Sequence, residues 1–449
     1  MRKNYGTKFD YLILYEGKAR ELISVILLAT ELENRGYTVS IQNSFSHQIK
    51  RKQKLDAEVI IVPFLYSDYE LYEYVYRVCG ENQKIINLRW EQVYSINDEC
   101  NMDYFGYPKN QAKKVYHMCW SEYLRELLIK SGVDESKAIN VGPIQMDVFS
   151  DKFRDYFLDR DEMANKYNID SSKKWNIFIS SFSYATLSKK EINSYQENVS
   201  NTAAYFADMS IKSKHEILVW IERQLKNGDI WIYRPHPAER DDNDIIELQE
   251  KYDNFCVIRE EDIKQWLIVV DRVFNWRSTC LADAYFAKKE TYILRPIKIS
   301  DRDETGVMNN VEMIESYEKF AEIFNDIIVK DVYRNVSNYY QKHDKYSYLL
   351  ISDICEKIYK NELPSCAIDY KKILDSLNKK TKFKNTSLYY CYIAFVIKCS
   401  SLSQNNILFK ILKNKIRLLN NNIRNIVDKE EIHKIMDRFK EMMCNNKIN

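Results

Sequence analysis

Residues 230–239 read IWIYRPHPAE, and this stretch indicates the kind of fold to expect. Four β-forming residues are followed by two prolines that flank a histidine. Because proline has no backbone N–H, a strand must end here, and each proline favours an extended conformation in the residue before it. We therefore predict a strand that leads into a stiff loop carrying Arg234, His236 and Glu239. Ligands bind at this end of a strand in open parallel sheets. Taken alone, the stretch also fits a plain surface turn.

The composition indicates a water-soluble protein of more than one domain. A chain of 449 residues is too long for a single core, so two or three domains are expected. The net charge of +2 gives no general signature of nucleic-acid binding. Ten cysteines without C-x-x-C pairs favour a reducing cytosol over a disulfide framework or a zinc site. The longest apolar run, 388–397, is about half a membrane span, and no signal peptide follows the basic start.

The first 150 residues alternate strands with helices. Residues 11–15 (YLILY) are a buried-strand pattern, 21–35 carry an apolar stripe at helical spacing, and 37–41 (YTVSI) form the next strand. A strand–helix–strand unit in this order predicts a parallel sheet. Further strands of this domain are expected at 58–63, 84–90, 115–120 and 138–141.

A second alternation follows, after a charged helix expected at 151–167. We predict the segment 189–208 to be an irregular polar loop, and the chain beyond about residue 312 to be purely helical. The expected fold class is α/β, with two Rossmann-like doubly wound domains facing a cleft and a C-terminal helical region. The predicted domains are 1–150, 151–330 and 331–449. Strands of the second domain are expected at 176–180, 230–233, 255–258, 272–274 and 291–294.

Polar residues follow three strands of the second domain, at ends that should meet on one edge of the sheet. Arg234 and Arg277 offer fork-shaped phosphate donors, and His236 can donate to a phosphate oxygen or protonate a leaving group. Ser278 or Thr279 can cap the next helix, whose free backbone N–H groups would attract an anion; an ordinary helix cap is the alternative. We predict a nucleotide-phosphate pocket. Its residues are Ser180, Ser181, Ser183, Arg234, His236, Pro237, Glu239, Arg277, Ser278 and Thr279.

The first domain also presents charged side chains after two of its strands. Glu16, Lys18 and Arg20 follow the first strand, and Glu91 follows the strand at 84–90. We expect Glu16 and Glu91 to face the cleft, where either carboxylate can act as general base on an acceptor hydroxyl. Lys18 and Arg20 are expected to hold an anionic group of the substrate. Surface charge is the alternative for Glu16.

Signals for metals and cofactors are weak. The D-x-D strings at 159–161 and 301–303 do not directly follow a buried strand, and the acidic run 241–244 suits a helix start. The sequence contains no P-loop, no G-x-G-x-x-G and no G-x-S-x-G motif. We therefore expect neither a metal nor a cofactor.

The C-terminal segment 371–424 is strongly basic, with twelve lysine or arginine residues and one acidic residue. Such helices can present a solvated face, or they can touch anionic lipid headgroups or a lipid-linked acceptor. We expect a cytoplasmic protein, with peripheral contact at the inner face of the plasma membrane as the alternative, and no nucleic-acid partner.

At this point the chain resembles a known group. Two Rossmann-like halves with a cleft between them resemble the GT-B fold of nucleotide-sugar glycosyltransferases, over roughly residues 8–330. His236-Pro237 after a strand, and Ser278-Thr279 before a helix, are similar to the HP and S-S/T motifs of bacterial sialyltransferases and capsule Kdo transferases. In those families the histidine and the hydroxyls bind the nucleotide phosphate, and an acidic residue of the N-terminal domain is the base.

Two N-terminal stretches carry a second resemblance. Lys18-x-Arg20-Glu21 with the Leu-rich helix after it, and Arg89-Trp90-Glu91-Gln92, are similar to bacterial surface-carbohydrate biosynthesis proteins.

The chain departs from the family pattern at several positions. Tyr15-Glu16-Gly17 keeps one carboxylate where the sialyltransferase motif has two, and Asp283-Ala284 stands where Glu-Ala is usual. Lys288-Lys289-Glu290 replaces the usual Gly-Lys-Pro. The resemblance therefore implies the fold, but the donor does not follow from it.

The function implied is transfer of a sugar, with a CMP-sugar favoured as donor, to a capsule- or O-antigen-type surface polysaccharide. Alternatives are a CDP-polyol transferase of the teichoic-acid type, a non-catalytic nucleotide- or carbohydrate-binding protein, and a sugar-nucleotide epimerase, since epimerases share this fold.

Overall fold

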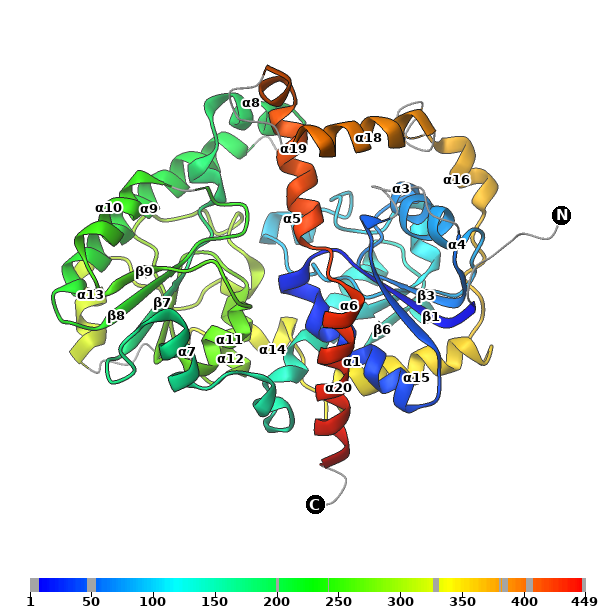
Figure 1. Ribbon diagram of the computed structural model, residues 1–449, viewed down its shortest axis with the longest axis horizontal. Helices are drawn as coiled ribbons and strands as arrows, with labels where there is room; N and C mark the ends of the chain where they lie inside the picture. Colours follow the sequence, from blue (N-terminus) through cyan, green and yellow to red (C-terminus); the bar gives the residue numbers. More distant parts are fainter. Residues whose placement is uncertain are drawn as a thin grey trace. The chain divides into compact units, whose positions relative to one another are not determined.

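The computed structural model describes residues 8–46, 54–198, 202–240, 242–325, 331–378, 381, 387–400 and 407–445. The chain divides into two compact units, each built on one parallel sheet (Figure 1). Unit 1 comprises Met1–Gln92, Asn101–Phe153 and Gln341–Asn449, and unit 2 comprises Val93–Cys100 and Arg154–Tyr340. The C-terminal helices therefore group with the N-terminal strands in unit 1.

The sheet of unit 1 has six parallel strands in the order β2-β1-β3-β4-β5-β6. Because β2 lies on one side of β1 and β3 on the other, the strand order reverses between β1 and β3. Ligand crevices of doubly wound sheets lie at the carboxyl ends of such a pair. The bounds are β1 Lys8–Tyr15, β2 Val39–Asn43, β3 Asp56–Val62, β4 Ile85–Asn87, β5 Tyr116–Cys119 and β6 Ala138–Asn140.

Helix α1 (Lys18–Asn34) connects β1 to β2 and is buried on more than one side. The predicted stripe of Leu22, Val25, Ile26, Ala29 and Leu32 is buried, and so are Leu27 and Leu28. Two C-terminal helices, α15 (Ser347–Tyr359) and α20 (Lys429–Asn445), contact α1 and account for this extra burial (Figure 1). The helix ends before Gly36, whose positive φ of 92° suits glycine at that position.

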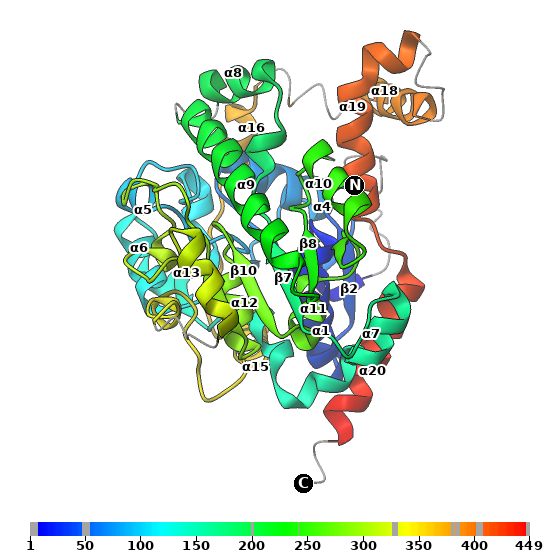
Figure 2. The same cartoon turned by 90° about the vertical axis from the view of Figure 1, so that its left-hand side faces the viewer.

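The sheet of unit 2 has five parallel strands in the order β11-β10-β7-β8-β9. Its strand order reverses between β7 and β10, so this pair forms the second switch point. The long helix α9 (Ala203–Leu225) crosses one face of this sheet (Figure 2). The strand bounds are β7 Trp175–Ile179, β8 Ile230–Arg234, β9 Phe255–Val257, β10 Arg272–Asn275 and β11 Glu290–Ile293.

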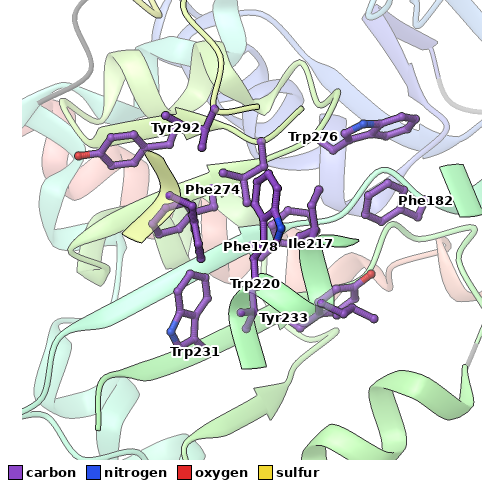
Figure 3. Close-up of a cluster of buried hydrophobic side chains, with 14 of the residues drawn as sticks. Phe178, Phe182, Ile217, Trp220, Trp231, Tyr233, Phe274, Trp276 and Tyr292 are labelled. Carbon is purple, nitrogen blue, oxygen red and sulfur yellow. The ribbon is translucent and has the colours of Figure 1, made fainter. Parts of the chain in front are cut away.

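A row of aromatic side chains crosses the middle of this sheet (Figure 3). Tyr233, Phe178, Phe274 and Tyr292 occupy directly opposite positions on four neighbouring strands. Tyr233 stacks on Phe178 with ring centres 5.5 Å apart, and Phe274 stacks on Tyr292 at 5.3 Å. Each such pair contributes about 0.5–1.5 kcal/mol beyond burial. The row fixes the strands whose carboxyl ends carry the predicted pocket.

The remaining helices of unit 2 connect these strands in order. Their bounds are α7 Arg160–Tyr167, α8 Lys189–Asn198, α10 Asn243–Lys251, α11 Ile263–Val269, α12 Cys280–Phe286 and α13 Tyr317–Glu322.

The prediction of an irregular loop at 189–208 is wrong. Helix α8 covers its first half and α9 begins within its second half. Ser188 and Glu191 exchange backbone-to-side-chain hydrogen bonds that start α8. The buried residues at the start of α9 include the small side chains of Ala203 and Ala207, which give a weak hydrophobic signal.

The single helix expected at 151–167 is also wrong, because it is two pieces. A 3-10 helix at Asp151–Tyr156 is followed by α7, which Asp159 and Glu162 start with a capping box. This cap was visible in the sequence as D-x-x-E.

The last part of unit 1 is helical, as predicted. Within the residues that the structure describes, no helix is long and apolar enough to cross a membrane. The helices are α16 Tyr370–Ser376, α18 Ser387–Cys399, α19 Ile407–Arg424 and α20.

Candidate functional site

The three predicted segments of unit 2 meet at one edge of the sheet, because β8, β7 and β10 are neighbours. The backbone N–H of Arg277 donates to Ser181 Oγ at 3.2 Å, which joins the ends of β10 and β7. The backbone N–H of Ser180 donates to the carbonyl of Arg234 at 3.0 Å, which joins β7 to β8. The three segments therefore meet on one edge of the sheet, as predicted.

Glu239 lies beneath this surface and fixes its loops. Its carboxylate is buried and accepts hydrogen bonds from the hydroxyls of Ser180 and Tyr233, the latter at 2.7 Å. Lys214 of α9 supplies the buried countercharge, with Nζ 3.5 Å from Glu239 Oε1 and 2.9 Å from Asp242 Oδ2. Ser180 and Glu239 hold the loop after β8 against the end of β7, and their part in ligand binding stays a prediction.

His236 is exposed in the loop that Glu239 fixes, and its proton position follows from one hydrogen bond. Nδ1 accepts the backbone N–H of Ala238 at 3.1 Å. A neutral imidazole has one N–H and one lone-pair nitrogen, so the proton lies on Nε2. Desolvation by the surrounding protein lowers the pKa of His236, and Glu239 opposes this to a smaller extent. At neutral pH the ring is therefore a neutral donor through Nε2–H.

Two arginines share one carboxylate beyond β10 and β11. Nε of Arg277 lies 3.8 Å from Glu304 Oε1, and Nη2 of Arg295 lies 2.8 Å from Glu304 Oε2. Burial lowers the pKa of Arg295 to about 10, with Arg277 adding to this effect and Glu304 opposing it. Both guanidiniums stay charged at neutral pH. The carboxylates of Asp303 and Asp98 join Glu304 in opposing the effect of burial, which lowers the pKa of Arg277.

Arg277 is oriented by further contacts. Its Nη2 donates to the carbonyl of Asp303 at 2.6 Å, and its guanidinium lies 4.8 Å from the centre of the Phe206 ring. The Arg295 side chain behind it is only 2% exposed, and its Nε and Nη1 have no hydrogen-bond partner among the described residues. Nε of Arg277 also has no hydrogen-bond partner among the described residues, so an anion near it would meet an available donor.

The prediction of free backbone N–H groups ahead of α12 is wrong. The N–H of Cys280 donates to Ser278 Oγ, and those of Leu281 and Ala282 donate to the carbonyls of Ser278 and Thr279. Ser278 therefore caps the helix, whereas Thr279 is exposed and makes no cap with its side chain. Side chains, not the helix start, supply the donors on this edge.

The remaining predicted residues of unit 2 lie in different positions. The guanidinium of Arg234 donates to the backbone carbonyls of Glu260 and Glu261, so its fork already shapes the turn after β9. Ser183 begins a short 3-10 helix after β7, and Pro237 is exposed beside His236. The assignment of Arg234 to a phosphate stays a prediction, and it would require those bonds to be exchanged.

Unit 1 places a cluster of carboxylates at its own switch point, in the loop after β1. The guanidinium of Arg20 contacts Glu21 at 2.6 Å, Glu16 at 3.7 Å and Glu91. Glu21 is fully buried and also accepts the backbone N–H of Glu16 at 2.6 Å. Three carboxylates around one guanidinium leave an excess of negative charge.

This arrangement changes the acidity of Glu16. Burial raises the pKa of Glu16 to about 7, with the carboxylates of Glu21 and Glu91 adding to the effect and Arg20 opposing it. A carboxylate with a pKa near neutral pH is suited to accept a proton from a hydroxyl group. The Glu91 side chain is 57% exposed, which makes Glu16 the stronger candidate for a base.

Lys18 and Arg20 are engaged by this unit's own carboxylates. Lys18 pairs with Glu431 of α20 at 2.8 Å, and both side chains are about half exposed. Arg20 lies among its three glutamates. The contact of Lys18 and Arg20 with an anionic substrate group stays a prediction, and the carboxylates around Arg20 weaken it.

The turn between α19 and α20 holds the loop after β1. Asn425 Oδ1 accepts the backbone N–H of Lys18 at 2.9 Å, and Val427 donates its backbone N–H to Tyr15 Oη at 3.0 Å. The side chain of Asn43 donates to the carbonyls of both Glu16 and Asn425 at 3.1 Å. The position of Glu16 therefore depends on residues near the end of the chain.

Comparison with known protein structures identifies the fold. No protein-family model and no curated protein sequence matches the chain. A structure of a variant of the wall teichoic acid polymerase TagF aligns with a TM-score of 0.52 and 14% identity, over 80% of this chain and 90% of that chain. The same enzyme soaked with CDPG aligns with a TM-score of 0.51 and 13% identity, over 79% and 89%. The chain has the GT-B fold.

A sugar-nucleotide epimerase also aligns. UDP-GlcNAc 2-epimerase from Neisseria meningitidis, bound to UDP-GlcNAc, gives a TM-score of 0.48 and 11% identity, over 77% of this chain and 100% of that chain. At such identities the likeness concerns the fold, and the chemistry must be argued from the residues of this GT-B chain itself.

The acidic strings of this GT-B chain have structural roles. Asp159 caps α7, and the backbone of Asp303 receives Arg277. Asp242 caps α10 and pairs with Lys214. Among the described residues, no group of three or more His, Cys, Asp or Glu side chains is arranged to hold a metal ion.

Sequence reasoning missed three residues that shape these two edges. Arg295 and Glu304 complete the cluster with Arg277, and Lys214 neutralises Glu239. Glu21 was visible in the sequence after the first strand, and the structure adds that it raises the pKa of Glu16. Arg295 directly follows the strand predicted at 291–294, so its place at a strand end was a signal. Lys214 and Glu304 gave no such signal, because they reach their partners only through the fold.

Asp283, a departure from the family pattern, is held by an ion pair within unit 2. It occupies the position where Glu-Ala is usual, but it lies buried 3.6 Å from Lys264 Nζ. Burial raises the pKa of Asp283 to about 6, and Lys264 opposes this. Its carboxylate is therefore already paired within unit 2.

Proposed function

We propose that this GT-B chain is a glycosyltransferase that moves a sugar from a nucleotide-activated donor to a growing bacterial surface polysaccharide of the capsule or O-antigen type. Unit 2 takes the nucleotide donor, and unit 1 takes the acceptor, which is a polysaccharide or a lipid-linked chain. The reaction is metal-independent, because Arg277 and His236 meet the charge of the donor phosphate. A cytoplasmic location fits such a donor.

The observation that carries this proposal is the different set of side chains at the two switch points. Unit 2 offers the guanidiniums of Arg277 and Arg295 after β10 and β11, and the Nε2–H of His236 after β8. Unit 1 offers excess negative charge around Glu16. The first set suits a phosphate, and the second suits the removal of a proton from a hydroxyl.

The proposed reaction assigns one role to each set. Glu16 accepts the proton of the acceptor hydroxyl, whose oxygen then forms a bond to the anomeric carbon of the donor sugar. The bond between that carbon and the phosphate oxygen breaks, and the nucleotide leaves with the electron pair. Arg277 and the Nε2–H of His236 stabilise the negative charge that develops on the phosphate, while Ser181, Ser183 and Ser278 offer hydroxyl donors around it.

The donor base is proposed to be cytosine. The HP and S/T motifs are similar to those of enzymes that use CMP-sugars, and a TagF structure was soaked with CDPG. That second observation favours one further candidate, a CDP-polyol transferase, in which the acceptor oxygen attacks phosphorus instead of carbon. Product analysis separates the two, because a glycosidic linkage supports the first and a phosphodiester linkage supports the second.

A thermal-shift screen with CMP, CDP, UDP and GDP tests the donor. A ligand that binds only the folded state raises the melting temperature. We expect CMP or CDP to do so in the wild type and to lose the effect in Arg277→Ala. If none of the four nucleotides shifts the melting temperature, the assignment of unit 2 as a donor unit is wrong.

Two other functions predict different results. A non-catalytic binding protein would show the nucleotide shift without turnover, and Glu16→Gln would leave its binding unchanged. An epimerase would release free sugar or an altered sugar nucleotide without any acceptor. A mixture of sugar nucleotide and acceptor, analysed for free sugar and for extended product, distinguishes all three.

A further inference from the structure

Helix α18 (Ser387–Cys399) of unit 1 is apolar on two faces. Ile393, Val396 and Cys399 are buried and pack with Ile416 and Leu419 of α19 (Ile407–Arg424). These contacts account for one face only. A helix that is apolar all round is normally buried all round.

The other face of α18 is exposed and has no charge along most of its length. Leu388 is 67% exposed, Tyr392 39% and Phe395 48%, and their spacing of four and three residues places them on one stripe. Ile411 of α19 is 74% exposed. The first charged residue after the start of α18 is Lys398. Clustered exposed apolar side chains of this kind mark an interaction surface.

The charged residues of the sequence that contains this stripe favour one kind of partner. From residue 376 to residue 427 the sequence contains ten lysine or arginine residues and no acidic residue. The whole chain has a net charge of only +2, so the rest of it is net acidic. A protein partner or a second copy would have to match ten cations, whereas an anionic lipid surface offers both negative headgroups and an apolar layer beneath them.

The helix pair is attached to the core of unit 1. Arg77 donates to the hydroxyl of Tyr390 on α18, and Glu73 pairs with Arg77 from the same helical segment. The Arg77 and Glu73 side chains are both nearly buried. The outward stripe is thus presented from a fixed base.

We propose that α18 and α19 form a docking surface for an anionic lipid membrane, with Leu388, Tyr392 and Phe395 entering the headgroup region. The exposed side chains of Lys398 and Lys413 contact the headgroups. This inference does not depend on the chemistry proposed above.

Vesicle co-sedimentation of the full chain tests the proposal. We expect binding to phosphatidylcholine vesicles that contain phosphatidylglycerol and weak binding to phosphatidylcholine alone. The double variant Leu388→Asp with Phe395→Asp should lower the partition coefficient by about tenfold or more. Lys398→Gln with Lys413→Gln should lower it by about tenfold, and added salt should weaken wild-type binding.

A matched control distinguishes docking through α18 from non-specific binding of exposed apolar residues. Phe105 of unit 1 is 59% exposed and lies outside this segment, so Phe105→Asp should bind vesicles like the wild type. Circular dichroism and melting temperature verify that each variant is folded. Wild-type protein that stays in the supernatant with anionic vesicles overturns the proposal.

A second copy of the chain is the other occupant to exclude. If light scattering shows a wild-type dimer that Leu388→Asp with Phe395→Asp converts to a monomer, the stripe is a subunit interface and the lipid proposal is wrong. We expect the same mass for both proteins without lipid.

Discussion

The switch points of the two units have the same topology but carry different side chains. In unit 1, after β1 and β4, three glutamates surround one arginine. Between β7 and β10 of unit 2, and extending to the end of β11, two arginines share one glutamate. The sheet determines where a ligand would bind, whereas the residues after each strand determine what kind of ligand it would be. The predictions below test this difference, from the largest expected effect to the smallest.

Removing the proposed base should have the largest effect. Glu16→Gln keeps the size and the polarity of the side chain but cannot accept the proton, so kcat should fall by about a hundredfold to ten-thousandfold. Glu91→Gln is the matched control from the same cluster and should change kcat by much less. Steady-state kinetics with the donor found in the nucleotide screen measure both. Equal losses of kcat in the two variants would contradict the assignment of Glu16 as the base.

Removing the side chain of His236 should have the second largest effect, because it supplies one hydrogen-bond donor to the leaving phosphate. His236→Ala should lower kcat by about a hundredfold to a thousandfold. His236→Gln can place an amide N–H near the former Nε2 and should recover part of this loss. If His236→Ala turns over every nucleotide sugar tested at the wild-type rate, the mechanism is wrong. If glutamine recovers nothing, His236 acts by giving up a proton.

Arg295 tests whether the second arginine of unit 2 matters. Arg295→Met removes the buried charge and leaves Glu304 to neutralise Arg277 alone. Nucleotide affinity measured by calorimetry should fall by about tenfold, the effect of a charge-assisted contact of about 1.5 kcal/mol. Lys319→Met, on α13 of the same unit, is a control that should leave affinity unchanged. Unchanged affinity in Arg295→Met would show that Arg277 binds the nucleotide without it.

The pH profile tests the excess negative charge of unit 1. With a pKa of about 7 for Glu16, kcat/KM should fall as the pH drops below about 7, because the protonated carboxyl cannot act as a base. Glu21→Gln removes a neighbouring negative charge and should move this acidic limb to lower pH. An unmoved limb would mean that another group titrates.

The same shift has a consequence for stability, with a definite sign. The pKa of Glu16 is raised from its ordinary 4.5, so the folded state binds more protons than the unfolded state between that value and about 7. Its contribution to the free energy of unfolding therefore falls as the pH rises through this window. In Glu16→Gln this fall should be absent in denaturant titrations at pH 5 and pH 8.

The smallest effect should come from the ion pair of Lys18 and Glu431. Both side chains are about half exposed, and such pairs contribute about 0–1 kcal/mol. Lys18→Ala should therefore change the melting temperature little and leave kcat unchanged. A large loss of kcat at constant stability would instead support the predicted contact of Lys18 with substrate.

The sequence predicted the parts of this molecule that depend on local pattern. Runs such as 11–15 and 230–233 revealed the strands, and strand ends revealed where polar residues would meet, because parallel strands align their carboxyl ends. Residues that act through distant partners were not predictable. Lys214 reaches Glu239, and Glu304 reaches Arg277 and Arg295, only after helices and strands have packed.

The sequence also could not show which hydrogen-bond donors are already used within the protein. The N–H groups ahead of α12 and the fork of Arg234 looked available for phosphate, yet both are used within unit 2. Small buried residues explain the missed helices at 189–208, because Ala203 and Ala207 pack without a strong hydrophobic pattern. Local patterns identify where side chains gather, whereas the three-dimensional structure decides which of them are still free.

The contact between the loop of Glu16 and the turn after α19 has a consequence for synthesis on the ribosome. The hydrogen bond from Lys18 to Asn425 joins residues 407 positions apart, and that from Val427 to Tyr15 joins residues 412 apart. The β1 loop therefore leaves the ribosome long before the residues that hold it. During synthesis the loop that carries Glu16 therefore gains these two hydrogen bonds only after residue 427 has been added.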